Sequence, residues 1–351
     1  MNKYWSDVVK RLEPYVPGEQ PKDKKYIKLN TNENPYPPSP RAIEAIRQAA
    51  DERLRLYPDP DCDELKHVLA ENLGVKKEQV FVGNGSDEVL AFSFAAFFNP
   101  GEPILFPDIT YTFYPVYCQL YGIDYRTIPL DADFNIPVEG FLQDNGGIIF
   151  ANPNAPTGKF MDLASVEKIV KENIERVVVI DEAYVDFGGQ SAVKLIDKYP
   201  NLLVIKTLSK SHSLAGLRIG FALGNAGLIE GLDRVKNSFN SYTIDRIALA
   251  GAAEAIKDTA YFEKTRAKII HTRKWVGPEL EKLGFRLTDS LANFVFASHA
   301  SLDSEYLFKA LREKGVLVRY FNKPRINNYL RITIGTDQEM EQMIKVLKEL
   351  I

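Results

Sequence analysis

The segment 207–220 carries residue types that suit a cofactor with both an aldehyde and a phosphate group. Lys210 lies among small hydroxyl residues, and its amine could form a Schiff base with the aldehyde. Arg218 follows eight residues later, and its guanidinium could hold the phosphate together with the hydroxyl of Ser209. Pyridoxal phosphate needs both contacts. A surface loop with scattered basic residues is the alternative interpretation, and two further segments argue against it.

The first of these segments is an apolar run that ends in a carboxylate. Residues 177–180 are β-branched and apolar, which predicts a parallel strand buried on both faces. Asp181 follows at the carboxyl end of this strand, where open α/β sheets bind ligands. We expect its carboxylate to pair with a protonated pyridine nitrogen, and a helix N-cap is the alternative role. Tyr184 could donate a hydrogen bond to the phenolate oxygen of the cofactor ring.

The second segment is a proline-bearing loop that follows another short apolar run, residues 148–151. This run predicts a buried strand that delivers the loop to the same edge of the sheet. Asn154 lies in the loop, and the prolines and glycine around it indicate a stiff turn. Such a turn could aim the Asn154 amide at the phenolate oxygen. Alone, the pattern predicts only a rigid loop.

A glycine-rich turn offers further phosphate contacts. The apolar residues 80–82 predict a strand, and an apolar helix is expected to follow as far as Phe98. Gly85 and Ser86 lie between them, where backbone N–H groups at a helix N-terminus and a hydroxyl could bind a phosphate. Asp87 suits the helix dipole but would repel a phosphate, so the role of its side chain stays open.

These motifs resemble those of the fold-type I aminotransferases. The similarity spans nearly the whole chain, from Leu-Asn-Thr-Asn-Glu-Asn-Pro at residues 29–35 to Tyr-Leu-Arg-Ile-Thr-Ile-Gly at residues 329–335. It implies transamination, in which Lys210 carries pyridoxal phosphate and shuttles a proton. We expect burial and the cationic Arg218 to lower the pKa of this lysine, as a base near neutral pH requires.

The resemblance favours histidinol phosphate and 2-oxoglutarate as substrates, with glutamate as a product. Aromatic amino-acid transamination, phosphothreonine decarboxylation and a non-catalytic regulator are the alternatives. The resemblance implies that Arg331 binds the carboxylate in one half-reaction and the phosphate in the other, a bidentate role that suits arginine. A phosphate dianion calls for more positive charge, and Arg319 is the expected second partner. Surface arginines are the alternative interpretation of both.

Aromatic residues complete the site that the resemblance implies. Tyr111 follows a predicted strand and would stack on the pyridine face, with ordinary helix packing as the alternative. Tyr15 and Tyr57 would reach from the neighbouring subunit of a homodimer toward the substrate and the cofactor phosphate, respectively. Asn32, in the stretch at residues 29–35, is an expected substrate contact.

The order of the elements predicts where these residues are held. Between residues 36 and 243, strands interleaved with helices predict an α/β domain with a mostly parallel, doubly wound sheet. Residues 244–351 predict a smaller C-terminal α+β domain. Residues 1–35 are polar and weakly periodic, which is typical of an arm that lies on another surface.

Composition excludes several other classes of protein. The chain has 351 residues and a net charge of −3, which gives no electrostatic case for nucleic acid or anionic membranes as partners. We expect no metal site, because only four histidines occur. Cys62 and Cys118 form no disulfide framework, and the first twenty residues lack a secretory signal. The sequence therefore predicts a cytoplasmic enzyme.

Overall fold

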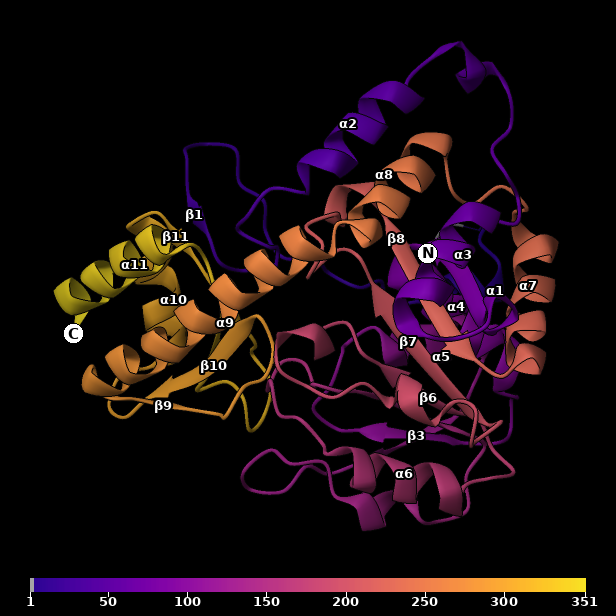
Figure 1. Ribbon diagram of the computed structural model, residues 1–351. Coiled ribbons are helices and arrows are strands. Elements are labelled where there is room, and N and C mark those ends of the chain that lie inside the picture. The colour runs from indigo at the N-terminus through magenta and orange to yellow at the C-terminus, as the bar shows by residue number, and fades with distance from the viewer. Residues whose placement is uncertain (1–2) are drawn as a thin grey trace.

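The computed structural model describes residues 3–351 and builds a large sheet of seven strands in the order β2-β8-β7-β6-β5-β3-β4 (Figure 1). Strand β8 runs antiparallel to both of its neighbours, and the other neighbouring strands run parallel. The predicted mostly parallel, doubly wound sheet is therefore confirmed. The strands are β2 (Val80–Asn84), β3 (Ile104–Pro107), β4 (Tyr125–Ile128), β5 (Ile148–Ala151), β6 (Val178–Asp181), β7 (Leu202–Thr207) and β8 (Ile219–Gly224).

The middle strands of this sheet are buried on both faces, as their apolar runs predict. Val178 and Ile180 of β6 pack into one apolar cluster, whereas Val179 packs into a second cluster on the opposite face. Burial of such side chains is the main force that holds helices against a sheet. The first cluster includes residues of α3 (Asp63–Leu73), α6 (Leu163–Glu172) and α8 (Arg246–Lys257), and the second includes residues of α4 (Gly85–Phe97), α5 (Tyr114–Tyr121) and α7 (Ala226–Phe239).

The parallel strands deliver three loops to one edge of the sheet. Ala151 at the end of β5 is paired with Asp181 at the end of β6, and Asp181 is paired with Ile205 of β7. The strands that precede the Asn-Pro loop and the Lys210 loop are therefore in register with β6, so Asp181 and the two loops lie at the same edge of the sheet. This arrangement is the one that the three sequence motifs predicted.

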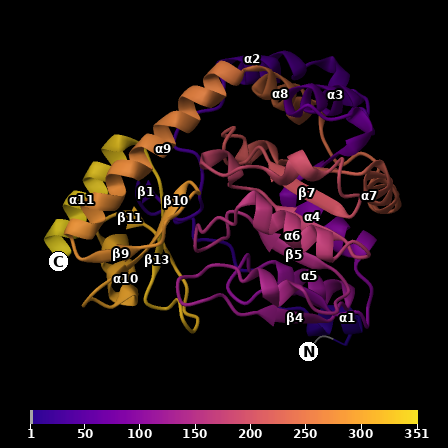
Figure 2. The same cartoon turned by 60° about the horizontal axis from the view of Figure 1, so that its bottom comes forward.

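A smaller antiparallel sheet forms the C-terminal part of the molecule, in the order β12-β13-β10-β9, which confirms the predicted α+β character. Figure 2 shows α9 running from the helices of the large sheet toward α11. Apolar residues of three helices cover the small sheet. The elements are β9 (Phe285–Leu287), β10 (Phe294–His299), β12 (Arg319–Tyr320), β13 (Leu330–Thr333), α9 (Thr259–Lys282), α10 (Ser304–Glu313) and α11 (Asp337–Leu350).

The N-terminal segment joins the C-terminal part of the chain. Strand β1 (Ile27–Lys28) pairs in parallel with β11 (Val316–Leu317), and α1 (Asp7–Arg11) precedes it within the predicted arm. Helix α8 lies beyond the predicted boundary at residue 243, yet it packs on α2 (Pro40–Ala49) and α3 in the apolar cluster of the large sheet. The division of the chain at residues 35 and 243 stays a prediction.

Local differences from the expected elements have simple causes. The spacing of the apolar residues over 39–56 predicts a single helix, but the helix ends at Ala49 and a short 3-10 helix follows it. The sequence predicts the next helix from about Tyr111 to Tyr121, but it begins at Tyr114, directly before a proline that suits a first helical turn. Within residues 3–351, no helix has both the length and the apolar character needed to cross a membrane. The 3-10 helices are η1 (Glu52–Arg55), η2 (Lys77–Gln79), η3 (Val138–Phe141), η4 (Val185–Phe187), η5 (Ala192–Leu195) and η6 (Ala215–Leu217).

Candidate active site

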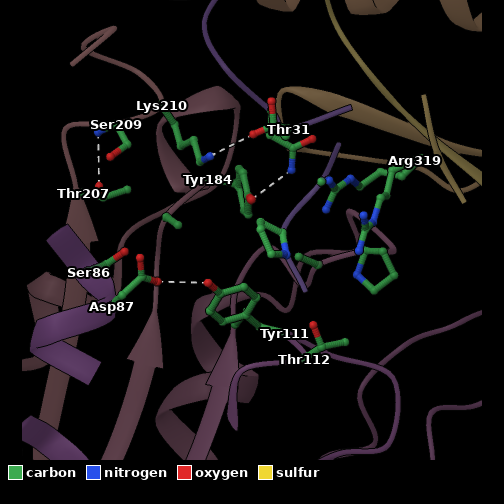
Figure 3. A pocket seen from close by; sticks show the side chains of 18 of the residues that line it. Thr31, Ser86, Asp87, Tyr111, Thr112, Tyr184, Thr207, Ser209, Lys210 and Arg319 are labelled. Carbon is green, nitrogen blue, oxygen red and sulfur yellow. Dashed lines mark hydrogen bonds between the residues drawn. The ribbon is translucent and has the colours of Figure 1, made fainter. Parts of the chain in front are cut away.

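A cavity of about 260 Å³ lies at the carboxyl edge of the large sheet and is also lined by residues of the N-terminal segment and the small sheet (Figure 3). Most of the predicted site residues line it. Those that do are Tyr15, Asn32, Ser86, Asp87, Tyr111, Asp181, Tyr184, Ser209, Lys210, Arg218, Arg319 and Arg331.

Lys210 extends into the cavity from the loop after β7. Its Nζ donates a hydrogen bond to the carbonyl oxygen of Thr31 at 3.2 Å, and Figure 3 shows this contact. The pKa of Lys210 is lowered to about 8, mainly by burial. The positive charges of Arg331 and Arg218 also lower it, and the effect of Arg331 is the larger of the two. Burial and Arg218 were expected to lower this pKa, and both do, whereas Arg331 was not named for this effect.

Asp181 lies on the floor of the cavity with only 5% of its surface exposed. Its carboxylate accepts hydrogen bonds from the Tyr114 hydroxyl at 3.2 Å and from the Ala183 N–H at 3.1 Å. Burial raises the pKa of Asp181 to about 6, against these hydrogen bonds, which lower it. A cation held opposite this carboxylate would restore its ionised form. The site therefore fits a protonated pyridine nitrogen.

The alternative role of Asp181 as a helix N-cap does not describe its contacts. The next helical element, η4, begins at Val185, and Tyr184 occupies its N-cap position. Tyr114 is a partner that the sequence motifs did not reveal. A signal was available, because a tyrosine on an apolar helix needs a polar partner when its hydroxyl is buried.

A cluster at the start of α4 holds Arg218 in place. Arg218 Nη2 lies 2.9 Å from Asp87 Oδ2, and the Tyr111 hydroxyl donates to Asp87 Oδ1 at 2.9 Å. Gly85 has a φ of +81°, and a Cβ there would lie 2.6 Å from Arg218 Nη2. Glycine is therefore required at this position. The Asp87 side chain, whose role the sequence left open, pairs with the guanidinium and lies beside Ser86 (Figure 3).

Tyr184 and Asn32 meet at the far side of the Lys210 amine. The Asn32 amide donates to the Tyr184 hydroxyl at 2.9 Å, so the hydroxyl proton of Tyr184 stays available for another acceptor. Burial raises the pKa of Tyr184, which keeps that proton on the oxygen. Asn32 is itself fixed, since its Oδ1 accepts from the Thr333 hydroxyl at 3.0 Å.

Arg319 and Arg331 are cations without acidic partners among residues 3–351. Arg331 Nη2 donates to the Asn30 carbonyl at 2.9 Å, but its Nε is buried and has no hydrogen-bond partner. Its guanidinium lies over the rings of Phe294 and Phe321, at 5.4 and 5.6 Å from their centroids. Arg319 Nη2 reaches the Val16 carbonyl at 3.4 Å. Two unneutralised guanidinium groups at one cavity have the chemistry needed to bind an anion.

Three predicted residues do not line the cavity. Asn154 uses both amide hydrogens elsewhere, on the Ile109 carbonyl at 2.9 Å and on the Thr157 hydroxyl at 3.1 Å. Its contact with the cofactor stays a prediction that requires these bonds to rearrange. Gly85 lies behind the Arg218 guanidinium. Tyr57 is 78% exposed and lies outside the cavity of its own chain.

Tyr15 lies in a different place from the one expected. It was expected to reach a neighbouring subunit, but it lines the cavity of its own chain and stacks on Phe113, with 4.8 Å between ring centroids. Thr31 and Phe321 also line the cavity and were missed. Thr31 belongs to the motif at residues 29–35 and contributes a backbone carbonyl, a group that side-chain patterns do not reveal.

Comparisons with known proteins agree with this geometry. The family model for aminotransferase class I and II matches residues 24–347. The histidinol-phosphate aminotransferase of Clostridium acetobutylicum is 58% identical over 351 residues and covers all of both chains. That of Clostridium beijerinckii is 58% identical over 348 residues, which is 99% of this chain and 97% of the relative.

Solved structures give the same result. The histidinol-phosphate aminotransferase of Sinorhizobium meliloti in complex with pyridoxal-5'-phosphate is 25% identical and covers 100% of this chain and 99% of its own, with a TM-score of 0.90. The aspartate aminotransferase of Thermus thermophilus with maleate, 19% identical with a TM-score of 0.84 over both full chains, shares the fold.

The chain therefore belongs to the class I and II aminotransferases, the pyridoxal-phosphate-dependent class that its fold and cavity define. Within this class, identity over the full length places it in the family of the histidinol-phosphate aminotransferases. The residues present fit the cofactor. Lys210 is a buried amine with a lowered pKa, Asp181 is a buried carboxylate that forms no ion pair among residues 3–351, and the N-terminus of α4 lies beside Arg218.

Proposed function

We propose that this enzyme transfers the amino group of histidinol phosphate to 2-oxoglutarate, which gives imidazole-acetol phosphate and glutamate in histidine biosynthesis. The choice of substrate rests on Arg319 and Arg331, which have no acidic partner within residues 3–351. Arg331 has a buried Nε with no partner, and Arg319 adds a second positive charge. A phosphate dianion satisfies both groups, whereas an aromatic amino acid offers only the single charge of its carboxylate.

The proposed roles of the other residues follow from their positions. Pyridoxal phosphate, when bound, supplies an electron sink that acidifies the α-carbon of the substrate. Lys210 is the base for that carbon, because a pKa of about 8 leaves an appreciable fraction of its amine unprotonated near neutral pH. Asp181 holds the protonated pyridine nitrogen. Tyr184 donates its free proton to the ring oxygen.

Both substrates use one anion site in this proposal. Arg331 receives the phosphate of histidinol phosphate in one half-reaction and the α-carboxylate of glutamate in the other. Phe294 and Phe321 flank its guanidinium, and the exclusion of water by these rings strengthens the ionic contact. Tyr15 forms an aromatic wall on the side of Phe113.

One assay tests the proposal directly. The purified protein is loaded with pyridoxal phosphate and given glutamate as the amino donor, with imidazole-acetol phosphate or phenylpyruvate as the acceptor. We expect a much larger kcat/KM for the phosphorylated acceptor. A preference for phenylpyruvate would overturn the substrate assignment in favour of an aromatic amino-acid aminotransferase.

We also propose that the enzyme works as a homodimer in the cytoplasm. Tyr57 stacks on Tyr242, and both rings are exposed, as is Phe239 three residues before Tyr242. A partner covering these rings would place Tyr57 at the cofactor phosphate of the second cavity. The buried free thiols of Cys62 and Cys118 suit a reducing compartment.

Mixing two inactive variants tests this arrangement. Lys210→Ala and Tyr57→Ala subunits should regain activity when mixed, because a mixed dimer has one cavity with both residues intact. Light scattering measures the mass of the unaltered protein. A monomer, or no recovery on mixing, would contradict the dimer.

A further inference from the structure

A buried ionic cluster lies behind the Lys210 loop, outside the lining of the cavity. Lys206 Nζ, from β7, lies 2.9 Å from Asp186 Oδ1, and Asp186 belongs to η4. The hydroxyl of Ser211 donates to the other oxygen of Asp186 at 2.6 Å. The sequence motifs assigned no role to these three side chains.

The cluster is too well buried to be an incidental surface pair. Lys206 is 7% exposed and Ser211 is 1% exposed. Burial acts to raise the pKa of Asp186, but the ammonium of Lys206 and the hydroxyl of Ser211 bring it below its ordinary value. Asp186 is therefore charged, and it is bonded to both Lys206 and Ser211. Asp186 is less buried than its two partners, with 19% of its side chain exposed, but a carboxylate bonded to both holds the elements that carry them in a defined geometry.

The cluster joins the two turns that carry Tyr184 and Lys210. Asp186 follows Tyr184 by two residues, and Ser211 follows Lys210 directly. On the other side of the loop, the Asn34 amide donates to the carbonyl oxygens of Lys210 and Ser211, at 3.0 and 3.2 Å. Asn34 thus holds the backbone at Lys210, and Asp186 holds the side chain of the next residue, Ser211.

We propose that Ser211 and Asp186 are positioning residues that fix the Lys210 loop relative to Tyr184, while Lys206 holds Asp186 in place through its ion pair. The inference deepens the proposed function and rests on it. The Lys210 amine must reach both the cofactor and the substrate carbon, and a displacement of about 1 Å can cost roughly a hundredfold in rate. The hydroxyl of Ser211 limits that displacement.

Ser211→Ala removes the hydrogen bond to Asp186, together with a contact to His212 Nδ1 at 3.1 Å, and leaves the Lys206–Asp186 ion pair in place. We expect kcat to fall by about tenfold or more, with KM for both substrates almost unchanged, because the anion site does not involve this contact. Ser165→Ala is the matched control. Its hydroxyl also donates to an aspartate, Asp162, at 2.7 Å, but on α6 and away from the cavity.

Hydrogen exchange of the cofactor-free protein tests the same idea without turnover. The Leu214 N–H donates to the Leu208 carbonyl at 3.1 Å and closes the Lys210 loop. We expect this amide to exchange about tenfold faster in Ser211→Ala than in Ser165→Ala. Because this measurement needs no substrate, it separates failure of the positioning inference from failure of the proposed function.

The double variant Asp186→Asn with Lys206→Met removes the ion pair but keeps an acceptor for the Ser211 hydroxyl. The asparagine side chain introduced by the first change is not charged, yet its amide oxygen can still accept from Ser211. Glu182, which lies 3.9 Å from Lys206, loses that cation but keeps its hydrogen bonds from the Ser191 hydroxyl and the Ala192 N–H. We expect this variant to keep more of its kcat than Ser211→Ala. Unchanged kcat and unchanged exchange in Ser211→Ala would overturn the proposal, as would equal losses of kcat in Ser211→Ala and Ser165→Ala.

Discussion

The two walls of the cavity differ in the partners that their charged side chains have within the protein. On the wall built by the large sheet, Arg218 is paired with Asp87, and Asp181 accepts hydrogen bonds from Tyr114 and the backbone. On the wall built by the small sheet and the N-terminal segment, Arg319 and Arg331 have no carboxylate partner among residues 3–351.

This difference separates what the protein holds permanently from what it exchanges. A cofactor that stays bound can be met by groups that are already oriented by one another. Substrates that enter and leave need a site whose charge is unsatisfied until they arrive, and unpaired guanidinium groups provide that. Changes to the first wall should therefore affect all substrates equally, and changes to the second should discriminate between them.

The largest effect is expected at the centre of the first wall. Lys210→Ala removes both the covalent attachment and the proton shuttle, so turnover should fall by at least about 10⁴-fold for every substrate. The visible absorption band of the bound cofactor should be lost as well. Absorbance after loading and dialysis, together with kcat, measures both. A normal band in this variant would disprove the assignment of Lys210.

Asp181→Asn should have the next largest effect. The contacts to the cofactor phosphate remain, so much of the cofactor should stay bound, but the pyridine nitrogen loses its counter-ion. We expect turnover to drop roughly 10²- to 10³-fold, to the same degree for histidinol phosphate and for phenylalanine. Cofactor content and single-turnover rates check this. Near-native turnover would reduce Asp181 to a structural role.

On the second wall, Arg319→Ala should distinguish substrates. It removes one charge-assisted contact, worth about 1.5–3 kcal/mol, so kcat/KM for histidinol phosphate should fall about ten- to a hundredfold. Kinetics with phenylalanine should barely change. Arg286→Ala, an exposed arginine of β9 in the same small sheet, is the control. Equal losses on both substrates would mean that Arg319 is structural.

The smallest effect concerns the stability of the cofactor-free protein. The pKa of Asp181 in the folded protein, about 6, lies above its ordinary value of 3.8, so the folded state binds this proton more tightly. The resulting stabilisation is complete below pH 3.8 and is lost as the pH rises through 6, by at most about 3 kcal/mol.

Thermal unfolding of cofactor-free protein between pH 4 and 7 measures this effect. The unaltered protein should lose stability relative to Asp181→Asn as the pH rises through about 6. Added cofactor should remove the difference, because a cation then faces the carboxylate. Parallel pH profiles for the two proteins would show that Asp181 is not strained when the cavity lacks its cofactor.

The first wall could largely be predicted from the sequence because its residues follow directly from strand ends. The apolar runs before Asp181 and before the Asn154 loop define strands, and parallel strands place their carboxyl ends together. Helix α7 (Ala226–Phe239) was missed, since the two glycines within it weaken the helical signal. Pro115 marked the true start of α5, a signal that the aromatic residues before it concealed.

The second wall was harder to predict from the sequence because it is assembled from distant parts of the chain. The side chain of Asn32 bonds to that of Thr333, 301 residues away, and local patterns do not encode such a pairing. The side on which Tyr15 lies depends on the path of the N-terminal segment. Arg319 and Arg331 could be named from the resemblance, but their lack of acidic partners became evident only in three dimensions.

The pairing of β1 with β11 also affects the order in which the enzyme can fold during its synthesis. Residues 27–32 leave the ribosome early, yet their partners on β11 and β13 are made near the end of synthesis. The Leu29 carbonyl accepts from the Thr333 N–H at 2.9 Å, so this wall cannot close before β13 exists. The large sheet can form while translation continues. A nascent chain that stalls before residue 330 would therefore hold a nearly finished cofactor wall and no means of retaining a substrate.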